Sequence, residues 1–171
     1  VRFHTGHDYY NMEFLGQTYF QPPFPRGYAW LMTLATIPVV SLVLFATGVG
    51  RSGWERVVMP ARGARAPEDL ASVELLWALS VIVNYGPWLS RGTPIFGGTK
   101  HWLCAYPFMM LFAGLGFAWV CDQLAAWAKG PARRAVVPAT AAAVLGAPLV
   151  ETLRVHPWGL SAYTPLVGGT P

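Results

Sequence analysis

Charged side chains are scarce in this sequence of 171 residues: Asp, Glu, Lys and Arg together make up 12%, about half the share that soluble globular domains carry. A soluble domain of this size needs a polar surface that so few charges cannot supply. Aromatic residues are abundant, at 14%, which excludes a disordered chain. The hydrophobic fraction of 54% and the mean hydropathy of +0.38 therefore indicate a membrane protein.

Cysteine is also rare, and the pattern of a nucleic-acid-binding protein is missing. Cys104 and Cys121 lie in one apolar run, where a continuous helix would hold them about 25 Å apart, too far for a disulfide. The net charge is +4, but the basic residues stand between apolar runs and form no polar basic stripe. This distribution is typical of topology signals and headgroup contacts. We therefore expect membrane lipids as partners and no nucleic acid.

We expect no signal peptide at Val1, because the residues that follow it are polar and aromatic instead of forming an apolar segment. The other end stops abruptly within the glycine-containing residues 168–171. Both ends have the composition of an interrupted chain. We expect a fragment whose missing helices belong to the same parent chain.

Four apolar runs are candidates for membrane spans, since a helix needs about 20 apolar residues to cross a bilayer. We expect Pro38 to kink the first of them, and the fourth must include residues 151–153 to be long enough. The sequence thus predicts an all-α integral membrane protein with about four transmembrane helices. The expected spans are about 27–50, 70–90, 102–125 and 135–153.

The basic residues predict the orientation of these spans. Seven of them lie in the connections 51–69 and 126–134, and five lie in the segments 1–26, 91–101 and 154–171, whose combined length is about twice as great. The positive-inside rule places the denser group in the cytoplasm. The three other segments then form the outer face, which carries all four histidines. We expect the inner membrane of a bacterium.

The sequence Phe-Gly-Gly-Thr-Lys-His-Trp at 96–102 is the sharpest local feature of that face. Gly97 and Gly98 permit positive φ and expose backbone N–H groups, and Lys100 and His101 follow just before the expected third helix. A phosphate would find amides, a cation and the helix dipole together there. A turn with a snorkelling lysine and an interfacial tryptophan explains the same residues without a ligand.

A second candidate site on the outer face takes residues from its other two segments. His4 and His7 have the spacing of two metal ligands on one helical face, but no third ligand follows at a fixed spacing, so we expect no metal. The chain also has no catalytic triad, P-loop, CxxC or GxGxxG motif, and its catalytic residues stay unassigned. The members of this second candidate site are His4, His7, Asn11, Arg154 and His156.

An ordered set of stretches resembles the bacterial family-39-like glycosyltransferases of the GT-C class. This family includes relatives of the dolichyl-phosphate-mannose–protein mannosyltransferases and of the lipid A aminoarabinose transferase. The resemblance covers the C-terminal part of the family's membrane module, and Trp158 and Thr164 depart from its usual tyrosine and asparagine. The stretches are NMEFLG at 11–16, PPFP at 22–25, TIP at 36–38, FGGTKHW at 96–102, RVHPW at 154–158 and LVGG at 166–169.

The resemblance implies a helical bundle that takes a sugar from a polyprenyl-phosphate carrier on the extracytoplasmic face. It assigns Lys100 and His101, with Gly97 and Gly98, to the loop that holds the carrier phosphate, and it implies no cofactor. The family's catalytic carboxylate lies in an earlier loop, which this chain does not contain. The parent protein is then a mannosyltransferase-like enzyme, and we expect the fragment alone to be inactive.

Two other functions are compatible with the sequence. A small transporter subunit would need ionisable residues at mid-membrane, whereas Glu74, Asp122 and Glu151 lie near the ends of their spans, where we expect them to reach headgroup level. A non-catalytic membrane scaffold is neither favoured nor excluded by the outer residues.

Overall fold

The fold is helical, with one short β-hairpin. The computed structural model describes residues 11–61, 71–93, 95, 98–157, 159 and 163–169. Its strands and α-helices are β1 (Met12–Phe14), β2 (Gln17–Tyr19), α2 (Tyr28–Thr36), α3 (Val39–Gly53), α4 (Met59–Ala61), α5 (Ala71–Tyr85), α6 (Tyr106–Trp127) and α7 (Ala132–Val155). A π-helical turn, η1 (Trp54–Val58), joins α3 to α4, and the 3-10 turns are η2 (Gly86–Leu89), η3 (Gly98–His101), η4 (Leu103–Ala105) and η6 (Pro165–Val167).

The first expected span, 27–50, consists of two helices instead of one kinked helix. The proline ring disfavours a helical conformation for the residue before it, and Ile37 accordingly has φ −88° and ψ 131°. α3 starts directly after Pro38, and the helical path continues through η1 to Ala61, beyond the expected end. The two parts of the run differ in direction by 118°. Pro38 therefore breaks the run.

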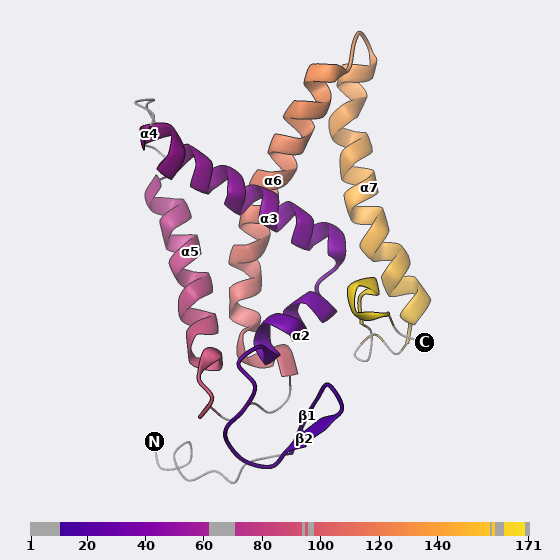
Figure 1. The fold of residues 1–171 in the computed structure, drawn as a ribbon. Helices are drawn as coiled ribbons and strands as arrows, with labels where there is room; N and C mark the ends of the chain where they lie inside the picture. The colour runs from indigo at the N-terminus through magenta and orange to yellow at the C-terminus, as the bar shows by residue number, and fades with distance from the viewer. Residues whose placement is uncertain are drawn as a thin grey trace.

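Two helical stretches are long and apolar enough to cross a membrane, Leu103–Trp127 and Ala132–Val155, and the bent α2–α3 pair adds a third if it counts as one span. The first two correspond to the third and fourth expected spans. α7 extends beyond 135–153 at both ends and contains two prolines, which membrane helices tolerate. α6 and α7 form an antiparallel hairpin (Figure 1), whose turn includes Gly130 at φ +59°.

The second expected span, 70–90, appears as the 15-residue α5 followed by η2. Pro87 cannot donate a backbone hydrogen bond into the preceding turn, and the chain leaves η2 in an extended conformation at Ser90, with ψ 136°. Within the described residues, α5 is shorter than a full membrane crossing. The described part of the chain thus has two or three membrane-length helices, and the four-span arrangement stays a prediction.

α3 crosses α6 at a point where the two backbones touch (Figure 1). A Cβ atom on Gly48 would collide with the carbonyl oxygen of Phe112, and a Cβ atom on Gly116 would collide with that of Leu44. Lipid tails supply no hydrophobic drive for helix association, so close packing of small residues takes its place in membrane bundles. The two glycines are what permit this crossing.

The described parts of the three expected outer segments lie toward one end of the molecule. Figure 1 shows the β-hairpin, the η2–η4 region and the C-terminal turn toward the lower part of the view, while α4 and the α6–α7 turn lie at the top. The backbone N–H of Phe24 donates to the carbonyl of Arg91 at 2.8 Å, which ties the first outer segment to the second. The three segments are thus grouped as expected, while their orientation across the membrane stays a prediction.

The C-terminal segment completes the end of α2. In a continuous helix the carbonyl of Leu34 would accept from residue 38, but Pro38 has no N–H. The hydroxyl of Thr164 donates to this carbonyl at 2.8 Å, and the N–H of Thr164 donates to the carbonyl of Ala35 at 2.7 Å. The break at Pro38 is therefore satisfied by a residue from the far end of the chain.

Candidate functional site

Buried aromatic rings around Trp102 form the core of the end that carries the expected outer segments, which we call the outer end. Trp102 is fully buried, and its ring meets Tyr28 edge-on at 6.1 Å and lies tilted against Tyr85 at 6.1 Å and Trp88 at 6.4 Å. Its Nε1 has no hydrogen-bond partner among the described residues. An unpartnered buried donor costs free energy. The contribution of Trp102 to this core is therefore the packing of its large ring, which fills the space between α2, α5 and η2.

A buried hydrogen-bond chain fixes α2 against α5 beside this ring. The Thr33 hydroxyl donates to the carbonyl of Ala29 at 2.8 Å, which leaves its oxygen to accept from the Tyr85 hydroxyl at 2.6 Å. Trp30 stacks on Tyr85 with centroids 4.5 Å apart and an interplanar angle of 5°. The surroundings of Trp102 are thus held by specific polar and aromatic contacts.

Trp102 anchors the short turn that carries the candidate phosphate ligands. η3 ends where the N–H of Trp102 donates to the carbonyl of Thr99 at 3.2 Å. Gly98 has φ +63°, the left-handed conformation that its sequence position suggested. The His101 imidazole is half-buried and lies 4.4 Å from the Trp88 ring, and Lys100 is exposed. The turn therefore holds a cation and an imidazole at the surface.

A helical stretch begins directly after Trp102, as the sequence suggested. Its first turn is the 3-10 turn η4, and α6 itself begins at Tyr106, with Pro107 in its first turn. The charge of Lys100 and the imidazole of His101 are what this turn offers to an anion. Gly97 lies outside the described residues.

The structure describes the second candidate set only in part. His4 and His7 lie outside the described residues, Asn11 is exposed just before β1, and Arg154 and His156 are exposed at the end of α7. Whether these residues form one site stays a prediction. In the described part of the chain, no group of three or more His, Cys, Asp or Glu side chains could hold a metal ion.

A buried ion pair that the sequence did not reveal joins η1 to α5. The Arg56 Nε and Nη2 atoms lie 2.8 and 2.7 Å from Oε2 of Glu74, and the Ser52 hydroxyl donates to the same oxygen. Glu74 is only 6% exposed, so its carboxylate is enclosed by protein, which the sequence did not predict. Because the two charges compensate each other, this pair is suited to fastening two helices and not to carrying an ion.

Comparisons of the chain with protein-family models, with curated proteins and with solved structures find no match. The chemistry of the outer end must therefore indicate the function. An ammonium group and an imidazole on an anchored turn can bind an anionic oxygen by charge-assisted hydrogen bonds. Glu13 is exposed on β1 and makes no described contact with this turn that would give it a catalytic role.

Proposed function

We propose that this chain is part of a GT-C-type membrane glycosyltransferase whose outer end binds the phosphate of a polyprenyl-phosphate-linked sugar. The placement of Lys100 and His101 on a turn anchored by the buried Trp102, beside a membrane-length helix, carries this proposal. A polyprenyl phosphate keeps its chain in the bilayer and its phosphate at headgroup level. A cation at the outer mouth of an apolar helix matches that geometry.

Four passes through the inner membrane of a bacterium complete the proposed arrangement. The bent α2–α3 pair leads from the hairpin end to the opposite end, α5 returns, and α6 and α7 make the remaining two passes (Figure 1). The basic connections then lie in the cytoplasm. Lys100 faces outward in this arrangement, on the side where lipid-linked sugars are used by the family that the sequence resembles.

The proposed role of Lys100 is electrostatic. Negative charge develops on the departing phosphate during sugar transfer, so a nearby cation stabilises the transition state more than the ground state. The half-buried His101 is held against Trp88 and adds a second polar contact for the phosphate. The catalytic carboxylate is assigned to none of the described residues and belongs to the earlier loop that the resemblance implies.

Replacement of Lys100 tests this proposal in membranes that contain the full-length protein. Lys100→Ala should lower sugar transfer ~10²-fold, the loss expected for one electrostatic donor, whereas Lys100→Arg should keep part of the activity because it keeps the charge. Lys129→Ala removes the same charge at the α6–α7 turn and serves as the control. Activity of Lys100→Ala within about twofold of wild type, at equal membrane abundance, would remove Lys100 from the site.

A further inference from the structure

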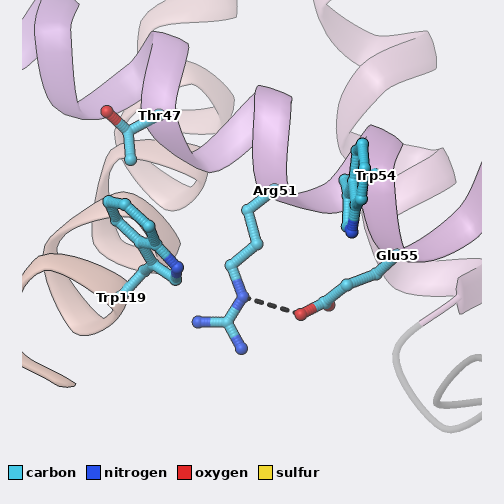
Figure 2. Close-up of a pocket in the computed structure, with 5 residues that line it drawn as sticks. All are labelled: Thr47, Arg51, Trp54, Glu55 and Trp119. Atoms are coloured by element: carbon cyan, nitrogen blue, oxygen red, sulfur yellow. Dashed lines mark hydrogen bonds and ion pairs between the residues drawn. The ribbon is translucent and has the colours of Figure 1, made fainter. Parts of the chain in front are cut away.

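A pocket of about 410 Å³ lies where the end of α3 passes the second half of α6. Figure 2 shows its lining, with the Arg51 side chain between the indoles of Trp54 and Trp119. Thr47 and Glu55 are the other described residues that line it. The hydroxyl of Thr47 already donates to the carbonyl of Val43 at 2.8 Å, so the charged pair and the two indoles determine what the pocket can bind.

The charged pair is only partly used within the protein. Nε of Arg51 donates to Oε1 of Glu55 at 2.8 Å, and the two side chains remain 35% and 29% exposed. Among the described residues, no hydrogen bond involves the terminal nitrogens of Arg51 or the second oxygen of Glu55. The pocket thus presents a positive group and a negative group side by side, each with hydrogen-bonding capacity to spare.

The pocket lies at the level where two apolar runs end. Arg51 is the first charged residue after the run 27–50, and Asp122 is the first after the run that begins at Trp102. Trp119 precedes Asp122 by less than one helical turn, and tryptophan rings favour the membrane–water boundary. The lining residues therefore face the zone in which hydrocarbon meets headgroups, on the side that carries the basic connections.

We propose that this pocket binds the headgroup of one zwitterionic phospholipid. The lipid phosphate accepts hydrogen bonds from the terminal nitrogens of Arg51. The headgroup ammonium lies against the second oxygen of Glu55 and the indole face of Trp119, which attracts cations. An anionic headgroup would meet the Glu55 carboxylate with no cation of its own to offset it, and is disfavoured. The site requires a membrane but is independent of sugar transfer.

Native mass spectrometry of the full chain tests the selectivity of the pocket. The chain is released from detergent micelles that contain equal amounts of palmitoyl-oleoyl phosphatidylethanolamine and phosphatidylglycerol. Wild type should retain one phosphatidylethanolamine in preference to phosphatidylglycerol. Arg51→Gln should weaken this retention about tenfold, because charge-assisted hydrogen bonds to the phosphate are lost. Glu55→Gln should invert the preference, because it leaves the positive charge of Arg51 uncompensated.

Matched variants on α7 provide the controls. Arg133→Gln and Glu151→Gln remove the same charges outside the pocket and should leave the lipid preference unchanged. A partly exposed ion pair one helical turn apart adds little to stability, so the pocket variants should keep the circular dichroism of wild type. Equal retention of both lipids by wild type would overturn the proposal. So would an unchanged preference in either Arg51→Gln or Glu55→Gln with native helicity.

Discussion

Glu74 places a carboxylate in surroundings that almost exclude water, at 6% exposure, and one of its oxygens takes hydrogen bonds from both Arg56 and Ser52. The Arg56 side chain keeps 23% of its surface exposed. Burial makes each charge dependent on the other, because the desolvation cost of a buried charge is no longer compensated once its partner is removed. The pair therefore fixes how η1 packs against α5, independently of its net contribution to the free energy of unfolding.

Removal of the Glu74 charge alone should destabilise the fold, because Arg56 is then left without its partner. Glu74→Gln should lower the free energy of unfolding by about 3 kcal/mol, the lower end of the range for a broken buried pair, because Arg56 is partly exposed. The measurement is denaturant unfolding in detergent micelles, followed by far-ultraviolet circular dichroism. A double variant, Arg56→Met with Glu74→Leu, should recover most of the loss.

Glu151→Gln is the control for this experiment, because Glu151 is a half-buried carboxylate on α7 outside the pair. It should unfold like wild type. Equal unfolding curves for Glu74→Gln and Glu151→Gln would show that the ion pair has no structural role.

Single residues were predictable from the sequence where their conformation is a local matter. The left-handed Gly98 followed from its lack of a side chain, and the extended Ile37 follows in the same way from the proline after it. The ion pair of Glu74 and the complete burial of Trp102 could not be predicted, because each depends on neighbours that come close only after the helices pack. For the ion pair, the one signal in the sequence was Glu74, a lone acidic residue in an apolar run.

At the scale of elements, the α3–α6 crossing should be the most sensitive packing contact. Gly48→Ala should destabilise the fold by at least about 1–3 kcal/mol, because the added methyl would meet backbone atoms of Phe112, which cannot rotate away. Gly50→Ala is the matched control, since a Cβ there meets nothing within 4 Å and alanine favours the helix. The same unfolding measurement should separate the two variants, and identical curves would contradict the close crossing.

Elements were predictable in proportion to their length. The long apolar stretches of α6 and α7 identified both helices, although α7 extends beyond its expected bounds because charged residues, Arg133, Arg134 and Arg154, continue the helix at both ends. The β-hairpin was missed, since strands of three residues carry too little alternation to detect. Its two-residue loop has positive φ at Leu15 and Gly16, as tight hairpins require, and only the glycine hinted at it.

The whole molecule should orient with its hairpin end outside the cell. On a Cys104→Ala background, which removes the exposed native thiol and leaves the buried Cys121, single cysteines can be placed at Lys129 and Arg154. A membrane-impermeant maleimide should label Arg154→Cys in intact cells and Lys129→Cys only after permeabilisation, because the basic α6–α7 turn lies inside. Arg154 suits this test better than Gly168, whose φ of +100° disfavours any side chain.

The background variant alone should take up no label. Labelling of Lys129→Cys but not Arg154→Cys in intact cells would reverse the orientation and would place the Lys100 turn in the cytoplasm.

The contact between Thr164 and the end of α2 also determines an order of events during synthesis. Leu34 and Ala35 leave the ribosome long before Thr164, since chains are made from the N-terminus, and the hydroxyl contact spans 130 residues. Until Thr164 emerges, the carbonyls of Leu34 and Ala35 lack the hydrogen bonds that the Thr164 hydroxyl and N–H donate in the finished fold. The α6–α7 hairpin, by contrast, joins neighbours in sequence and can form as soon as it is made. The outer end is therefore the part of the molecule that assembles last.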